Sequence, residues 1–380
     1  MSGAIYLDHH ATTPVDPAVL EEMLPWFTER PGNPHSRHHE HGWSAEAAVD
    51  IARLEISQLI NAPDHDILFT SGATESNNWA IRGLMPALSE EPGGRILVSA
   101  VEHPCVLESA RHCGLEVTEL PVDPAGGVDP ERVRLELDRG GVRLISLMLA
   151  NNEVGTIQPV AAIARIAREA DVWLHCDAAQ AVGRIPVNFE RLGVDLMSLT
   201  AHKFYGPKGI GALAISTRTH KMLLPLIRGG GQQGGFRSGT VPTPLAVGFG
   251  AAARRAREMM DGERKRIASL RDRLWSGLQA NAEGLELNGG EIMRLPGNLN
   301  FRIQGVDADD VIRAAPEIAV STGSACSSAS SEPSHVLKAL GLTESEIRSS
   351  IRIGIGRPNT DADIDTAIEV LTRAIGKARR

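Results

Sequence analysis

Two residues able to do chemistry, Lys203 and Asp177, each follow an apolar run typical of a strand. Lys203 lies in the segment SLTAHKFYGPKGIG at 198–211, directly after the apolar stretch 194–199. A crowded amine loses proton affinity because desolvation disfavours its charged form, and the neutral amine is a nucleophile that forms an imine with an aldehyde. Asp177 follows the run VWLHC at 172–176, which would bring it to the same strand-end edge. A Schiff-base lysine with an aspartate for a pyridinium nitrogen is typical of pyridoxal phosphate (PLP) sites, so the sequence predicts that cofactor.

Two glycine-containing segments are candidates for binding the cofactor's phosphate. The segment DILFTSGATESNN at 66–78 has the order strand, glycine turn and helix start, and the free N–H groups of a helix N-terminus suit a phosphate. Thr74 would add a hydroxyl there. The alternative is a helix cap without a ligand, because Ser and Thr favour such positions. The segment GGGQQGGFRSGT at 229–240 lacks the ending of a Walker loop, so we expect it to approach the phosphate with Thr240.

His103 follows another strand-like run, at 95–99, where its ring could stack on an aromatic cofactor. The alternative is an ordinary polar residue at a strand end. Zinc is a second alternative, raised by four neighbouring residues: His103, Cys105, His112 and Cys113. Their spacing matches no common zinc pattern, so no metal is expected.

Cys326 and Arg352 are candidates for work on a substrate. Cys326 lies in STGSACSSASS at 321–331, whose flanks are too polar for a core, so its exposed thiol is a candidate nucleophile. The alternative for a lone cysteine is a small buried hydrophobe. Arg352 lies among apolar residues in SSIRIG at 349–354, where an arginine often meets a carboxylate. The alternative there is a structural ion pair.

The elements that must position these residues alternate between strand-like and helix-like from about residue 40 to 220. We expect strands at 66–70, 95–99, 142–149, 172–176, 195–199 and 209–215, and helices at 44–59, 75–84 and 160–170. Val/Ile/Leu runs that alternate with helices predict an α/β fold with a large, mostly parallel sheet. Ligands bind such sheets at the carboxyl ends of the strands, where the polar motifs fall.

A long helix expected from 244 to about 280 precedes a change in pattern. After it, we expect short strands at 298–303, 318–321 and 350–355, mixed with helices at 307–315, 334–340 and 361–377. This pattern predicts a smaller α+β domain. The predicted limits are 15–255 for the large PLP-binding domain, and 1–14 plus 256–380 for the small domain that carries Cys326.

The composition is that of an ordinary globular protein, with 380 residues, 42% hydrophobic and 23% charged residues, and a net charge of −8. Without a basic block, no nucleic-acid partner is expected. No run of 18 apolar residues predicts a membrane span, and the N-terminus lacks the features of a secretory signal. The four cysteines show no framework spacing, so we expect a reducing, cytoplasmic location.

Taken together, the motifs resemble the cysteine desulfurases, PLP enzymes of the class V aminotransferase family. Their order and spacing agree from YLDHHATTP at 6–14 to SIRIGIGR at 350–357. STGSACSS at 321–328 with EPSHVL at 332–337 looks like the group with a long cysteine loop. That group serves iron–sulfur cluster assembly and thio-modification of tRNA. The resemblance implies a homodimer of PLP-dependent transferase fold type I.

The resemblance also assigns roles to individual residues. Lys203 forms the Schiff base with PLP and removes the Cα proton of the substrate, and Asp177 pairs with the pyridine nitrogen. The other implied cofactor contacts are Gln180 to the ring hydroxyl, His103 stacked on the ring and moving protons, Thr74, Thr200 and His202 on the phosphate, and Thr240 on the phosphate of the neighbouring subunit. For the substrate, Asn152 and Arg352 bind the carboxylate and Cys326 attacks the sulfur.

The implied reaction converts L-cysteine to L-alanine and leaves a persulfide on Cys326, from which sulfur passes to an acceptor protein. The alternatives are a selenocysteine lyase or small amino-acid aminotransferase of the same family, and a catalytically idle binding partner. Three features depart from the family pattern: Gln233-Gly234 in place of an acidic–basic pair, Gly354 in place of a hydroxyl residue, and an end at Arg380 without a further scaffold-docking tail. A dedicated or different acceptor is therefore an alternative to the iron–sulfur scaffold.

Overall fold

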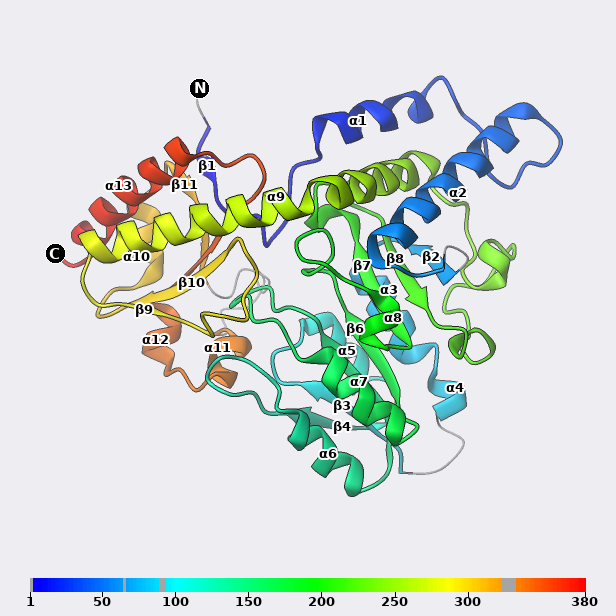
Figure 1. The fold of residues 1–380 in the computed structure, drawn as a ribbon, viewed down its shortest axis with the longest axis horizontal. Coiled ribbons are helices and arrows are strands. Elements are labelled where there is room, and N and C mark those ends of the chain that lie inside the picture. Colours follow the sequence, from blue (N-terminus) through cyan, green and yellow to red (C-terminus); the bar gives the residue numbers. More distant parts are fainter. Residues whose placement is uncertain (1–2, 64–65, 89–92, 323–332) are drawn as a thin grey trace.

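The computed structural model describes residues 3–63, 66–88, 93–322 and 333–380 (Figure 1). Among these residues, the larger part is built on a seven-stranded sheet with the order β2-β8-β7-β6-β5-β3-β4. Its strands are β2 (Ile67–Thr70), β3 (Arg95–Ser99), β4 (Glu116–Leu120), β5 (Val142–Met148), β6 (Trp173–Asp177), β7 (Leu196–Thr200) and β8 (Gly211–Ile215). Strand β8 pairs antiparallel with β2 and β7, and the other pairs are parallel. The prediction of an α/β fold with a mostly parallel sheet is confirmed.

Helices cover both faces of this sheet, and the side chains of each strand alternate between the two faces. In β3, Leu97 packs into the core on one face, while Ile96 and Val98 pack into the core on the other. The first face is covered by α1 (Pro17–Met23), α2 (Glu40–Ile60), α6 (Pro130–Asp138), α7 (Val160–Glu169), α8 (Phe189–Leu192) and part of α9 (Thr243–Asn281). The second face is covered by α3 (Ala73–Arg82), α4 (Met85–Leu88) and α5 (Pro104–Arg111). Because both faces are buried, most strands are continuous apolar runs.

The carboxyl ends of β2, β3, β5, β6 and β7 lie at one edge of the sheet, because these strands share a direction. Each end carries or precedes a polar residue singled out in the sequence: Thr74 beyond β2, His103 beyond β3, Asn152 beyond β5, Asp177 at the end of β6 and Lys203 beyond β7. The sheet therefore gathers residues that lie far apart in the chain.

The smaller part contains a four-stranded antiparallel sheet with the order β12-β13-β10-β9 among the described residues. Its strands are β9 (Leu285–Leu287), β10 (Asn298–Ile303), β12 (Ser321–Thr322) and β13 (Ser350–Gly354), and β1 (Ile5–Tyr6) pairs in parallel with β11 (Ile318–Ala319). The accompanying helices are α10 (Ala308–Ala314), α11 (His335–Ala339), α12 (Glu344–Arg348) and α13 (Asp361–Ala378). The predicted smaller α+β unit is thus present.

Helix α9 is 39 residues long and runs from the larger part into the smaller one (Figure 1). Its residues 246–256 contribute to the core of the larger part, whereas its residues 267–278 contribute to the core of the smaller part. Leu7 also packs into the smaller core, and Val19 into the larger one. On this basis we propose to keep the domain limits at 15–255 and at 1–14 plus 256–380. Although α9 is long, no helix in the described ranges is apolar enough to cross a membrane.

Candidate active site

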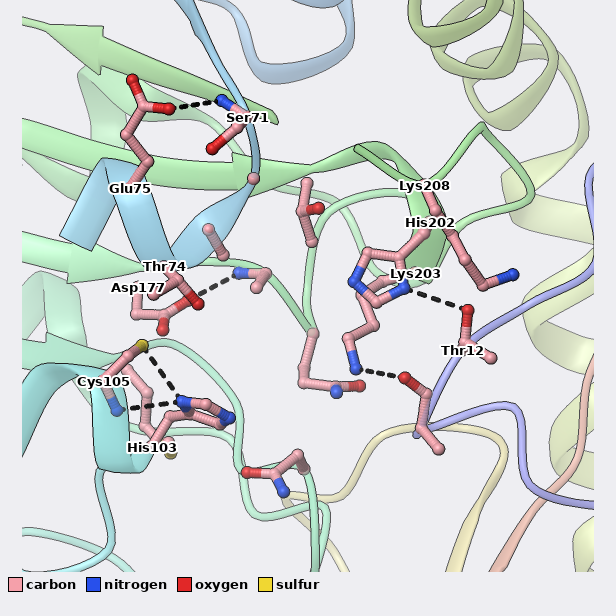
Figure 2. A pocket seen from close by; sticks show the side chains of 18 of the residues that line it. Thr12, Ser71, Thr74, Glu75, His103, Cys105, Asp177, His202, Lys203 and Lys208 are labelled. Carbon is pink, nitrogen blue, oxygen red and sulfur yellow. Dashed lines mark hydrogen bonds between the residues drawn. The ribbon is translucent and has the colours of Figure 1, made fainter. Parts of the chain in front are cut away.

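A cavity of about 490 Å³ opens at the carboxyl edge of the large sheet (Figure 2). Eight of the residues predicted for the site line this cavity: Thr74, His103, Asn152, Asp177, Gln180, Thr200, His202 and Lys203. Arg352 and Thr240 lie outside the lining, and Cys326 falls outside the described residues. The fold therefore brings together most of the predicted site.

Lys203 ends the short 3-10 turn Ala201–Lys203 that follows β7. Its Nζ atom donates hydrogen bonds to the backbone carbonyls of His10, at 2.8 Å, and Ala11, at 2.7 Å. Figure 2 shows the side chain extended into the cavity toward this N-terminal segment. The N-terminal segment thus fixes the position of the amine at the end of the sheet.

Asp177 is the last residue of β6, and its side chain is almost fully buried. Its Oδ2 atom accepts a hydrogen bond from Asn77 Nδ2 at 2.7 Å, and its Oδ1 atom accepts one from Ala179 N at 2.9 Å. These two donors hold the carboxylate at the cavity wall. Asn77 lies on α3, and the sequence did not single it out.

The N-terminus of α3 also opens into the cavity, because Ser71, Gly72 and Thr74 all line it. Gly72 is the N-cap residue, with a φ of 152° that favours glycine, and no described side chain caps the helix. An added Cβ at Gly72 would lie 4.0 Å from Thr200 Oγ1, which is ordinary van der Waals contact with the end of β7. The first N–H groups of α3 can therefore serve a phosphate.

His202 lies in the turn that follows β7, and its Nδ1 atom is 3.0 Å from Thr12 Oγ1. Burial, together with the cations Lys203 and Lys208, lowers the pKa of His202 to about 4. The imidazole is therefore neutral at pH 7 and can offer a hydrogen bond, but not a charge. Lys208 also lines the cavity, and the sequence motifs did not single it out.

The glycine-rich segment at 229–240 is fastened to the same edge by two side chains. Arg237 Nε donates to Glu75 Oε1 at 2.9 Å, and Glu75 Oε2 accepts from Ser71 N at 2.8 Å. The side-chain amide of Gln233 makes two hydrogen bonds to the backbone of Phe69 on β2, at 2.7 and 2.8 Å. A neutral amide both donates and accepts here, so the Gln233 departure has a structural role. Thr240, at the end of the segment, is exposed.

Arg352 is fully buried on β13 and forms a structural ion pair, the alternative to substrate binding that its sequence left open. Its Nη2 atom lies 2.8 Å from Asp8 Oδ1, and its Nη1 atom donates to the carbonyl of Asn152 at 3.4 Å. Its Nε atom is buried without a partner among the described residues. Asp8 was missed because a carboxylate in the N-terminal segment gives no sign of a partner more than 300 residues away.

The role of Arg352 in carboxylate binding stays a prediction. We expect Arg352→Lys to raise KM for cysteine by about tenfold or more, because a lysine keeps the charge but loses the planar fork and a charge-assisted hydrogen bond. Steady-state kinetics would measure this rise, with the visible spectrum of the bound cofactor unchanged. Arg302→Lys on the neighbouring strand β10 is the control. Unaltered cysteine binding by Arg352→Ala would show that this arginine has a structural role, in its ion pair with Asp8, and does not bind the substrate.

Two buried glutamates, Glu153 through its carboxyl and Glu102 through its backbone carbonyl, connect the loops beside this cavity to the segment that begins at residue 333. Ser334 Oγ donates to Glu153 Oε2 at 2.5 Å, and burial raises the pKa of Glu153 to about 7. His335 Nε2 donates to the carbonyl of Glu102 at 2.8 Å, and burial raises the pKa of the Glu102 side chain to about 8. Residues directly after the undescribed range 323–332 are thus tied to the loops beside Asn152 and His103.

Fold and site together define an α/β enzyme with a lysine and an aspartate at a strand-end cavity. Among the described residues, no group of three or more His, Cys, Asp or Glu side chains is placed to hold a metal. Residues 5–366 match the family "Aminotransferase class-V". The chain belongs to this family.

Relatives and solved structures extend over nearly the whole chain. The chain is 44% identical over 378 residues to "Cysteine desulfurase IscS" of Rickettsia felis, covering 99% of this chain and 92% of that protein. A solved "NIFS-LIKE PROTEIN" superposes with a TM-score of 0.91 at 34% identity, covering 98% of this chain and all of that chain. The structure "SspA in complex with cysteine" gives a TM-score of 0.82 at 36% identity, covering 93% and 99%. The predicted resemblance to cysteine desulfurases of fold type I is confirmed.

Proposed function

We propose that the cavity binds PLP through Lys203 and acts on L-cysteine. The observation that carries this proposal is the placement of an amine, Lys203, and a carboxylate, Asp177, in one cavity at the ends of adjacent strands β7 and β6. The uncapped N-terminus of α3 opens into the same cavity. These three features suit the aldehyde, the pyridine nitrogen and the phosphate of PLP, the cofactor that class-V aminotransferases generally use.

The chain is a cysteine desulfurase, and we assign separate steps of the reaction to Asp177, Lys203 and Cys326. Bound PLP supplies the electron sink for the reaction. Asp177 keeps a proton on the pyridine nitrogen, and Lys203 Nζ removes the Cα proton of the substrate and returns a proton when the product leaves. The Cys326 thiolate attacks the substrate sulfur, so that an S–S bond forms and the C–S bond breaks. The products are L-alanine and a persulfide on Cys326.

Substrate orientation is proposed to come from Asn152 and Arg352. Asn152 lines the cavity, and its backbone carbonyl accepts a hydrogen bond from the Arg352 guanidinium. The two residues are therefore neighbours and could bind the same carboxylate. We also propose that Gln180 contacts the ring hydroxyl and His103 the ring face, because both line the wall around Asp177.

The proposal also covers the oligomeric state, the location and the sulfur acceptor. Thr240 is exposed and does not line the cavity of its own chain, which suits a contact with the phosphate of a second subunit in a homodimer. We propose a cytoplasmic enzyme that passes sulfur to an acceptor protein, for iron–sulfur cluster assembly or thio-modification.

The test uses the purified protein with PLP and L-cysteine. We expect a visible Schiff-base absorbance that changes when L-cysteine is added, and one L-alanine formed for each sulfur transferred. A protein without this absorbance and without alanine formation would contradict the proposal. Alanine formed in a second cycle requires an acceptor thiol, so labelled sulfur can then be followed into candidate acceptor proteins.

Asp177→Asn should lower kcat/KM by about 10- to 150-fold, because the amide cannot hold the pyridinium proton and a charge-assisted hydrogen bond of about 1.5–3 kcal/mol is lost. Steady-state alanine formation measures the loss. Asp171→Asn changes the same group at an exposed turn and should leave the rate unchanged. Near-normal turnover by folded Asp177→Asn would reject the assigned role.

A further inference from the structure

We propose that Cys105 is a positioning residue whose thiol holds His103 in one tautomer and links it, through Asn77, to Asp177. The inference rests on the proposed function, because it concerns two residues assigned to the cofactor. It also changes the reading of Cys105, which in the sequence was notable only as a member of an unlikely zinc pattern.

The position of Cys105 already separates it from an ordinary core cysteine. It is the second residue of α5, and its side chain lines the same cavity as His103 and Asp177. His103 is the N-cap residue of this helix, so the two side chains start from its first turn. Figure 2 shows the sulfur beside the imidazole at the cavity wall.

Two groups of Cys105 approach the same nitrogen of His103. The backbone N of Cys105 donates to His103 Nδ1 at 3.2 Å, and the Sγ atom lies 3.0 Å from that nitrogen. A backbone N–H can only donate, so Nδ1 must be an acceptor, and the S–H proton then points to it as well. The neutral imidazole therefore carries its proton on Nε2, away from Cys105.

The thiol remains protonated across the working range of pH. Burial, together with the charge of Asp177, raises the pKa of Cys105 to about 12, against the lowering effect of hydrogen bonds from Asn77 and Thr74. Because the thiolate is the nucleophilic form of cysteine, this residue does not compete with Cys326 for sulfur. It serves instead as a permanent hydrogen-bond donor.

Asn77 extends the contact from Cys105 to Asp177 on the same wall of the cavity. It is fully buried on α3, and its Nδ2 atom lies 2.7 Å from Asp177 Oδ2 and 3.2 Å from Cys105 Sγ. If the Asn77 amide were turned over, its Oδ1 atom would face the Asp177 carboxylate, and two acceptors would repel each other. The Nδ2 atom must therefore face Asp177. The two N–H groups of the Asn77 amide thus donate to Asp177 and to Cys105. Accepting this bond polarises the Cys105 thiol, which strengthens its own hydrogen bond to His103.

The arrangement predicts the protonation behaviour of His103. Burial lowers the pKa of His103, Asp177 acts against it, and Lys203 and His335 lower the pKa further; a donor at Nδ1 also stabilises the neutral ring. Removing the thiol should therefore raise this pKa and loosen the choice between the two tautomers. A merely space-filling cysteine would have neither effect.

The experiment titrates His103 by NMR in the cofactor-free full chain, labelled with ¹⁵N at histidine, and assigns its signal from the spectrum of His103→Gln. In Cys105→Ala we expect a pKa rise of about 0.4 to 1 unit, the effect of losing one ordinary hydrogen bond to the neutral ring, and an increased share of the Nδ1–H tautomer. Cys105→Ser keeps a donor and should restore the wild-type titration. Cys113→Ala removes a partly buried thiol that packs outside the cavity and should change nothing.

The outcomes separate this inference from the proposed function. A wild-type titration in folded Cys105→Ala would overturn it, as would a rise in Cys105→Ser equal to that in Cys105→Ala. In the enzyme with PLP, the acid limb of the kcat/KM profile should move to higher pH in Cys105→Ala alone. Failure of the wild-type protein to form alanine would instead contradict the proposed function, because the titration needs no cofactor.

Discussion

Replacing Lys203 by alanine should abolish both the covalent attachment of PLP and the formation of alanine. The Nζ atom is placed in the cavity by the carbonyls of His10 and Ala11. No alanine side chain can form the imine or move the Cα proton. Loss of a positioned general base alone lowers rates by about 10²- to 10⁴-fold, so we expect turnover to fall at least that far.

Borohydride reduction followed by peptide mapping measures the attachment directly, since it fixes the pyridoxyl group on the amine that holds it. The adduct should lie on Lys203 in the wild type and be missing in Lys203→Ala. Lys221→Ala is the control, because Lys221 is exposed and lies outside the cavity. An adduct on Lys208, the other lysine of the cavity wall, would contradict the assignment.

Lys203 and Asp177 were predictable because each directly follows a buried strand, and a buried parallel strand is visible as a continuous apolar run. For this reason the predicted strand at 95–99 agrees with β3, and that at 142–149 differs from β5 by one residue. Strand β4, at the edge of the sheet, was missed because its sequence, EVTEL, has only two apolar residues and so shows no apolar run. The two-residue strand β1 is too short to show a period, whereas the strand predicted at 318–321 covers the two-residue strand β11.

The parts of the site that escaped prediction depend on contacts between distant segments. Asp8 meets Arg352, and Gln233 meets Phe69, through side-chain geometry that no local pattern contains. Asn77 is different, because a usable signal existed. It lies three residues after Thr74, and residues three apart share one face of a helix, so a phosphate role for Thr74 already implied an Asn77 on the side of the helix that faces the site.

Cys326 lies outside the described residues, but the described residues on both sides of it contact residues that neighbour Asn152, which lines the cavity. On one side, Ser321 pairs with Arg352 in the small sheet and donates to Asp8 Oδ2 at 2.7 Å. On the other side, Ser334 donates to Glu153, the neighbour of Asn152. The chain therefore leaves and re-enters the described structure next to both residues proposed to hold the substrate carboxylate, which supports the assignment of Cys326.

Cys326→Ser should separate substrate binding from sulfur transfer. The variant should still bind PLP and change its visible spectrum with L-cysteine, because Lys203, Asp177 and Arg352 are untouched. Alanine formation should fall by about 100-fold or more, the lower range for loss of a positioned catalytic group, since a hydroxyl is a far weaker nucleophile toward sulfur than a thiolate.

Mass spectrometry of the wild type after brief exposure to L-cysteine should find one added sulfur atom on Cys326. Cys113→Ser is the matched control, because this thiol lies outside the cavity and should be dispensable. Cys105 gives a further test, because its thiol lines the cavity. Its raised pKa keeps it protonated, so it should carry no added sulfur even in Cys326→Ser. An adduct on Cys105, or undiminished alanine formation by Cys326→Ser, would transfer the nucleophilic role away from Cys326.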